Sequence, residues 1–78
     1  MHLFRIDAIL DPHSLPRVVG LFAQRAIMPS AMQMHVADGM MRIQVTVDGL
    51  AAGQAAIIAA KLHAAVTVID AELDPMAA

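Results

Sequence analysis

The chain has 78 residues, of which 59% are hydrophobic and 15% are charged, and its formal net charge at pH 7 is −2. It has no cysteine, which excludes disulfide bonds, thiolate metal sites and thiol catalysis, and its five Lys and Arg residues and two phenylalanines offer little to a nucleic acid. Charged residues interrupt each apolar run before the roughly 18 residues that cross a bilayer, and no signal-peptide pattern is found, so we expect a cytoplasmic protein without membrane contact.

The small size of the chain limits how well it can fold alone. A domain of this length gains only about 3–5 kcal/mol from its own core. Its apolar fraction is nevertheless higher than so small a globule can easily hide. We therefore expect one domain over residues 1–78, with an ordered core of about residues 3–73, that self-associates or holds a permanent partner.

Alternating apolar and charged residues predict a strand from Leu3 to Leu10. Its apolar face consists of Phe4, Ile6, Ala8 and Leu10, and its polar face carries Arg5 and Asp7. Pro16 lacks an amide hydrogen and is tolerated only in the first helical turn, so a helix must begin near His13 or Ser14. An apolar stripe runs along this helix at Leu15, Val18, Val19, Phe22 and Ala26.

The short loop from Asp11 to Ser14 leads directly into this helix N-terminus. Backbone amides at such a position attract an anionic group. The charge of His13 would favour a carboxylate ligand there near neutral pH, although an exposed loop histidine needs no such role. Asp11 is better explained as a cap that closes the turn through an Asx-type hydrogen bond.

Pro29 places the next segment at the edge of the sheet, because proline cannot donate a hydrogen bond inside a central strand. We expect an edge strand within residues 27–37 that pairs fully only after Ser30. Its inward residues would be Met32, Met34 and Val36, with Gln33 and His35 outward. Asp38-Gly39 is a two-residue hairpin signal.

The rest of the chain predicts a strand, a helix and a last strand. Apolar residues alternate with polar ones from Met41 to Asp48, and Asp48-Gly49 closes this strand. The alanine-rich segment Leu50–His63 favours a helix. Val66–Leu73 is β-branched and predicts the final strand, with Ile69, Ala71 and Leu73 opposite Asp70 and Glu72.

This order of elements predicts an α+β fold, a ferredoxin-like βαββαβ unit with a four-stranded antiparallel sheet. Both helices must then cover the same face of the sheet. The other face is expected to be open to water or to a partner, and it carries Arg5, Asp7, Arg42, Gln44, Thr46, Asp70 and Glu72.

Five of the seven methionines lie around the edge strand and its hairpin, at Met28, Met32, Met34, Met40 and Met41. Methionine adapts to irregular contacts, and a second subunit could add its own edge strand here. Alternatively Met32, Met34 and Met41 are ordinary core residues, and Met28 and Met40 are the better interface candidates. For a homodimer that pairs edge strands and first helices, we expect an interface made by Val18, Phe22, Met28, Met32, Met34 and Met40.

No pattern for catalysis or metal binding is found in the sequence. His2, His35 and His63 lack metal-ligand spacing with one another or with carboxylates. Ser14 and Ser30 have no oriented base nearby in the sequence. We expect no catalytic residue, metal or cofactor, and an enzyme of this architecture would rest on fold analogy alone.

The first predicted helix contains the pattern leucine, any residue, arginine, two aliphatics, glycine, leucine and phenylalanine from Leu15 to Phe22, and the string continues to Arg25. Two shorter strings are Ala31-Met32-Gln33-Met34 and Leu62-His63-Ala64-Ala65-Val66-Thr67-Val68. Over about residues 3–73 the chain resembles the ACT domain of acetolactate synthase small subunits. The resemblance implies a non-catalytic regulatory subunit that binds the thiamine-diphosphate-dependent catalytic subunit of branched-chain amino-acid synthesis.

Many members of that family bind valine between two ACT domains, through an asparagine and a glycine before the first helix and an asparagine at the start of the second strand. The corresponding positions here are Leu10, His13 and Met28. A side chain at His13 fills the space that glycine leaves, and Leu10 and Met28 offer neither a donor nor an oxygen acceptor. The chain therefore looks closest to the short, valine-insensitive small subunit of isozyme II.

The alternative is a free-standing domain that binds an amino-acid effector. Such a domain would need polar replacements near His13 and Met28, for which Ser14 and Ser30 are available. The candidate ligand-binding residues are therefore Asp11, Pro12, His13, Ser14, Met28 and Ser30.

Overall fold

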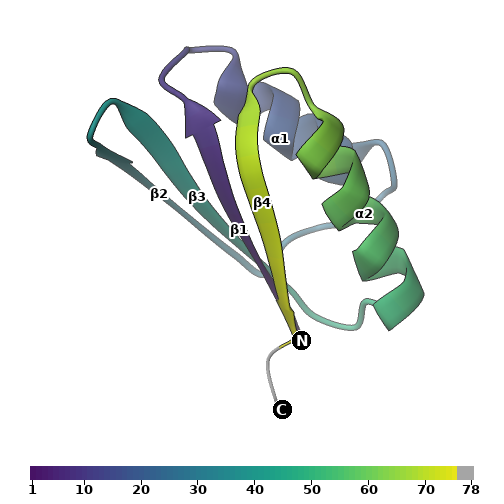
Figure 1. Ribbon diagram of the computed structural model, residues 1–78. Helices are drawn as coiled ribbons and strands as arrows, with labels where there is room; N and C mark the ends of the chain where they lie inside the picture. Colours follow the sequence, from purple (N-terminus) through teal and green to yellow (C-terminus); the bar gives the residue numbers. More distant parts are fainter. Residues whose placement is uncertain (76–78) are drawn as a thin grey trace.

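The computed structural model describes residues 1–75, which form a βαββαβ chain (Figure 1). The elements are β1 (His2–Ile9), α1 (Ser14–Ala23), β2 (Ala31–Ala37), β3 (Met40–Val47), α2 (Ala52–Ala64) and β4 (Val68–Pro75). The predicted order of an α+β, ferredoxin-like fold is confirmed.

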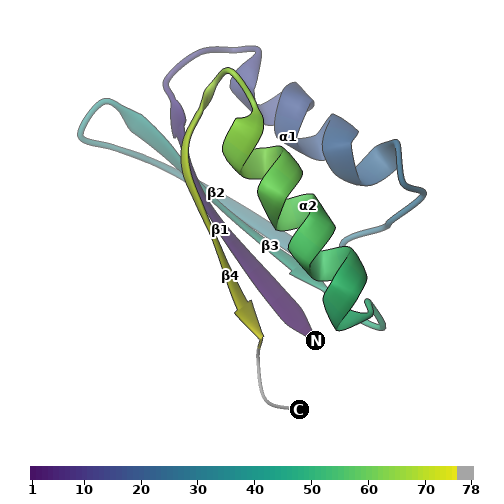
Figure 2. The same cartoon turned by 45° about the vertical axis from the view of Figure 1, so that its right-hand side comes forward.

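The four strands form one antiparallel sheet in the order β2-β3-β1-β4, so β2 and β4 are its edges. Figures 1 and 2 show both helices on the same face of this sheet. The opposite face is left open, as predicted. Within the described residues 1–75, neither helix combines the length and the apolar character that a membrane crossing requires.

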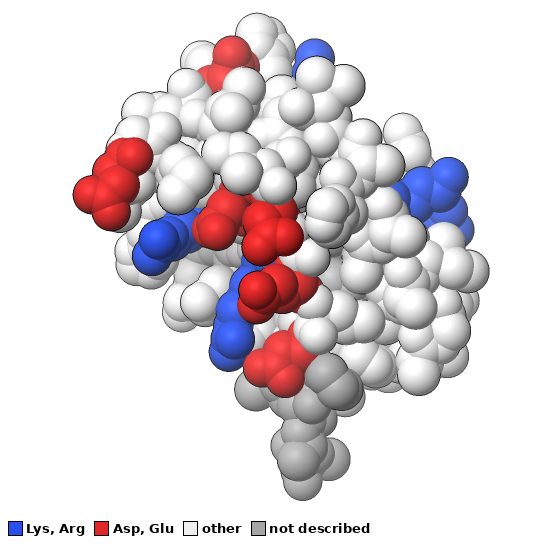
Figure 3. Space-filling view, viewed as in Figure 1, with Lys and Arg blue, Asp and Glu red and all other residues white. Residues whose placement is uncertain are grey.

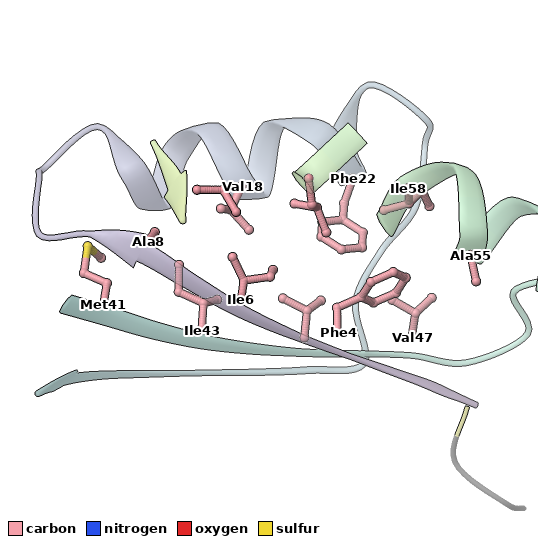
Figure 4. Close-up of a cluster of buried hydrophobic side chains, with 13 residues drawn as sticks. Phe4, Ile6, Ala8, Val18, Phe22, Met41, Ile43, Val47, Ala55 and Ile58 are labelled. Atoms are coloured by element: carbon pink, nitrogen blue, oxygen red, sulfur yellow. The ribbon is translucent and has the colours of Figure 1, made fainter. Parts of the chain in front are cut away.

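The core lies between the helices and the sheet (Figure 4). Phe4 of β1 and Phe22 of α1 meet edge to face, with ring centroids 5.2 Å apart and an interplanar angle of 79°, an arrangement that aromatic rings prefer. Alternate residues of β1 and β3 are buried against one stripe of each helix, which confirms the predicted alternation in these strands. The buried apolar residues are Phe4, Ile6, Ala8, Val18, Phe22, Met41, Ile43, Val45, Val47, Ala55, Ile58, Leu62 and Val68.

The helices leave β2 partly uncovered. Met32, Met34 and Val36 pair with buried residues of β3 and so lie on the helix side of the sheet, yet their exposed fractions are 37%, 42% and 56%. We call these three residues the β2 flank. The interpretation of Met32 and Met34 as core residues is therefore wrong, whereas Met41 is buried as expected.

The turns around β2 follow the predicted chemistry. Pairing with β3 begins at Ala31, directly after Ser30, as expected from Pro29. Asp38 and Gly39 have φ angles of 54° and 74°, and positive φ at both positions is what a two-residue type I′ hairpin requires.

Several element boundaries differ from the sequence prediction. Leu10 lies outside β1, because the chain already turns toward α1 after Ile9, and it is exposed instead of joining the core. α1 ends at Ala23, so Ala26, with a left-handed φ of 56°, does not extend the helical stripe. α2 begins at Ala52 instead of Leu50, and β4 runs from Val68 to Pro75 instead of residues 66–73.

Candidate functional site

Asp11 closes the loop between β1 and α1. Its Oδ1 atom accepts a hydrogen bond of 2.7 Å from the backbone N–H of His13 and lies 2.9 Å from the Nδ1 atom of the same residue. The backbone hydrogen bond from His13, and after it the contact with the His13 ring, holds the pKa of Asp11 below its ordinary value of 3.8. The predicted Asx-type turn is confirmed.

This turn places the chain's own carboxylate at the start of α1. His13 is the N-cap residue, and its N–H is taken by Asp11. The N–H of Ser14 donates a hydrogen bond of 3.0 Å to the carbonyl oxygen of Asp11. An external anion at this helix N-terminus would have to compete with Asp11 for backbone amides, so the geometry does not favour a free carboxylate ligand here.

Both candidate serines donate to backbone carbonyl groups. Ser14 is fully buried, and its Oγ donates a hydrogen bond of 2.8 Å to the carbonyl oxygen of Ile9, which ties the loop to β1. Ser30 is exposed and its Oγ donates a hydrogen bond of 3.2 Å to the carbonyl oxygen of Thr46. Neither hydroxyl proton is therefore free for a ligand in this geometry.

A hollow of about 320 Å³ lies beside the β1–α1 loop, and we call it the loop hollow. It is lined by Leu10, Asp11, Pro12, Met34, Val36 and Met41. The structure thus brings two predicted site residues, Asp11 and Pro12, against the β2 flank. Because the other lining side chains are apolar and Asp11 is already paired with His13, the hollow suits an apolar group better than a zwitterion.

Met28 and Ser30 lie at the other end of β2, away from His13. Both precede the strand, whereas the loop hollow borders its second half, at Met34 and Val36. Met28 is 86% exposed and borders a second hollow of about 360 Å³. This helix-end hollow is lined by Val19, Ala23, Ala26, Ile27, Met28 and Pro29. Within a single chain, the predicted ligand-binding residues are therefore divided between two places.

Two of the predicted interface residues belong to the core instead. Val18 and Phe22 point from α1 toward the sheet (Figure 4), and their exposed fractions are 0% and 1%. A partner cannot reach them, which corrects their assignment to the dimer interface. Val19, the next residue along, is the exposed apolar residue of this stripe. The other four interface residues, which are Met28, Met32, Met34 and Met40, remain at least partly exposed and stay predictions.

Sequence reasoning missed Leu10, Val19 and Val36 as exposed apolar residues next to the two hollows. All three lie in apolar patterns that are typical of core residues. The spacing of apolar residues in the sequence reveals such a pattern, but the exposure of each side chain depends on where the helices end relative to β2. The one available signal was the excess of apolar residues over what a small core can hold.

The open face of the sheet carries a separate, charged hollow of about 250 Å³. The Nε atom of Arg42 lies 3.7 Å from Asp7, and a guanidinium nitrogen of Arg5 lies 3.3 Å from Asp74. Asp70 lies directly opposite Asp7 in the pairing of β1 with β4. Figure 3 shows carboxylates gathered in a band beside cationic groups. Among the described residues, no group of three or more His, Cys, Asp or Glu side chains could hold a metal ion.

Known proteins share this architecture. A family model for an ACT-like domain matches residues 1–78. The ACT domain from the GTP pyrophosphokinase of Chlorobium tepidum superposes with a TM-score of 0.74 at 13% identity, covering 94% of this chain and 95% of that chain. The C-terminal domain of the MgtC protein from Mycobacterium tuberculosis superposes with a TM-score of 0.68 at 14% identity, covering 94% and 83%. A search of curated protein sequences found no match.

Proposed function

Because the chain belongs to the ACT-like domain family, we propose that it is a non-catalytic regulatory or accessory subunit that forms a homodimer and binds the catalytic subunit of acetolactate synthase. ACT domains are generally regulatory and bind small molecules, which supports the regulatory part of the proposal. The string from Leu15 to Arg25, which covers most of α1 and the two residues after it, resembles acetolactate synthase small subunits and supports the choice of partner.

The β2 flank is the observation that carries the role in protein binding. Met32, Met34 and Val36 expose apolar surface on the helix side of the sheet, and the exposed Leu10 and Met28 lie near its two ends. Apolar patches of this kind mark sites of protein interaction. β2 is also an edge strand, whose outer N–H and C=O groups can pair with a strand of another chain.

Reconstitution with a catalytic subunit tests the proposed partner. The chain is mixed with the purified large subunit of acetolactate synthase from the same genome, and we expect the two to co-elute and acetolactate formation to rise. Met34→Lys should weaken co-elution, because it places a charge on the β2 flank and so disturbs the homodimer that docks on the catalytic subunit. Lys61→Glu alters an exposed residue of α2 and serves as the control. If the wild-type chain neither co-elutes nor changes the activity, the proposed partner is wrong.

The second candidate function is a free-standing domain that binds an amino acid. The family match favours it, since ACT domains generally bind small molecules. The pairing of Asp11 with the start of α1 disfavours it, because the amide of His13 is already used. Isothermal titration calorimetry with valine, leucine, isoleucine and serine separates the two functions. Saturable binding of any one of them supports the sensor, and no heat from all four removes it.

A further inference from the structure

The loop hollow and Met28 lie at opposite ends of one edge strand. The hollow borders Met34 and Val36 in the second half of β2, whereas Met28 lies three positions before the first residue of the strand. When a strand pairs antiparallel with a second copy of itself, the start of one copy lies beside the end of the other. A twofold axis repeats this contact, so each copy can fill the hollow of the other.

Starting from the homodimer proposed above, we propose that Met28 of the partner subunit fills the loop hollow of each chain. A protein side chain then occupies the place beside the β1–α1 loop where an effector would otherwise bind. The homodimer is thereby closed to zwitterionic amino acids.

The chemistry of the two surfaces matches. Leu10, Pro12, Val36 and two methionines supply an apolar lining, and the carboxylate of Asp11 is held by His13. Methionine is unbranched and polarizable, so its thioether adapts to an irregular apolar hollow. Met28 is 86% exposed in the single chain, which leaves a large apolar side chain in water until a partner covers it.

The charges along the sheet edges favour a second copy through β2. The segment from Ala31 to Ala37 contains no Lys, Arg, Asp or Glu, and its one histidine, His35, pairs with Arg42 on the open face. When two copies of β2 pair, no carboxylate or ammonium groups of like charge therefore face one another on the helix side of the sheet. The other edge, β4, carries Asp70, Glu72 and Asp74, so two copies of β4 would bring carboxylates together.

Site-specific cross-linking tests the contact directly, because the chain has no cysteine of its own. Met28→Cys and Val36→Cys chains are prepared separately, mixed, and treated with a short bismaleimide. We expect a covalent dimer of one chain of each kind. Met28→Cys alone should give little product, since the two copies of this residue lie at opposite ends of the interface. Met28→Cys mixed with Val66→Cys is the matched control, because Val66 is 89% exposed but lies in the loop before β4.

Sedimentation of charged variants gives an independent measurement. Met28→Asp should raise the dimer dissociation constant about a hundredfold or more, because two side chains lose their apolar burial in each dimer. Val66→Asp should leave the constant unchanged. Both residues are exposed in the single chain, so circular dichroism should show the same fold for the two variants and the wild type.

The outcomes separate this inference from the proposed function. A wild-type chain that stays monomeric at every concentration overturns the homodimer, and with it both proposals. A dimer in which Met28→Cys fails to cross-link to Val36→Cys, or in which Met28→Asp and Val66→Asp behave alike, overturns the Met28 contact and leaves the homodimer intact.

Discussion

Ser14 is a fully buried hydroxyl whose hydrogen bond of 2.8 Å to the carbonyl of Ile9 fastens the β1–α1 loop to the sheet. Ser14→Ala should lower the free energy of unfolding by about 1–3 kcal/mol, because it leaves a carbonyl group without its partner. Ser30→Ala is the control. Its bond of 3.2 Å to Thr46 is exposed, so we expect a smaller loss. Urea unfolding measures both, and equal losses would contradict the anchoring role of Ser14.

Asp11 should make the stability of the loop depend on pH. Its pKa is lowered mainly by the backbone hydrogen bond from His13, so this contribution is complete above the unfolded value of 3.8 and is lost as the pH falls through the lowered folded value. Titration of the Asp11 carboxyl carbon by NMR should show a pKa below 3.8. His13→Ala should raise that pKa only in part, because the backbone donor remains. A carboxyl that titrates at 3.8 or above in the wild type would contradict this.

The β1–α1 loop and α1 differ in how well a sequence predicts their contacts. The Asp11 turn could be predicted because the bond joins residues two positions apart and depends on no distant contact. The roles of Val18 and Val19 could not be separated in the same way. Both belong to one apolar stripe, and only the position of α1 on the sheet decides that the first is buried and the second is exposed.

At the scale of the elements, two glycines should respond to alanine in opposite directions. Gly39 has a φ of 74° in the hairpin, where a Cβ atom is strained, so Gly39→Ala should lower the free energy of unfolding by about 1 kcal/mol. Gly20 lies inside α1 with open space around it, so Gly20→Ala should raise the free energy of unfolding by about 0.5–1 kcal/mol. Thermal unfolding of the two variants measures the difference, and a shared sign would contradict the backbone argument.

The strands differ in how well their sequences predict which residues are buried. β1 and β3 alternate between buried apolar and exposed polar residues, so their two faces were evident. Apolar and polar residues also alternate along β2, but an edge strand shows this pattern whether or not a helix covers its apolar face. The half-exposed state of Met32 and Met34 therefore needed the three-dimensional arrangement.

In the whole molecule, a substitution in the core should affect folding, whereas a substitution in the β2 flank should affect association. Phe22→Ala removes a fully buried ring and should lower the free energy of unfolding by about 3–5 kcal/mol, which is most of the stability of so small a domain. Met34→Lys changes a residue that is 42% exposed and should keep the fold. Circular dichroism with sedimentation distinguishes unfolding from loss of the proposed homodimer. Unfolding of Met34→Lys would contradict this division.

The overall architecture was predictable because six consecutive segments each carry a local signal and their order admits few topologies. The candidate site was only partly predictable. The loop residues Asp11 and Pro12 do lie together, but Met28 and Ser30 lie elsewhere in the single chain. Distances between loops are set by the lengths of the strands and by the path of α1, and the residue types near Met28 do not contain that information.

The two edges of the sheet differ in charge, and this difference affects whether further chains can be added to the sheet. In the homodimer proposed above, pairing through β2 around a twofold axis would use that edge in both chains and leave β4, with Asp70, Glu72 and Asp74, as the outward edge. A ribbon of many chains would need the acidic edges to join as well, against mutual repulsion. In the proposed homodimer, assembly by strand addition would therefore stop at a closed pair, and we expect concentrated solutions of this very apolar chain to resist fibril formation.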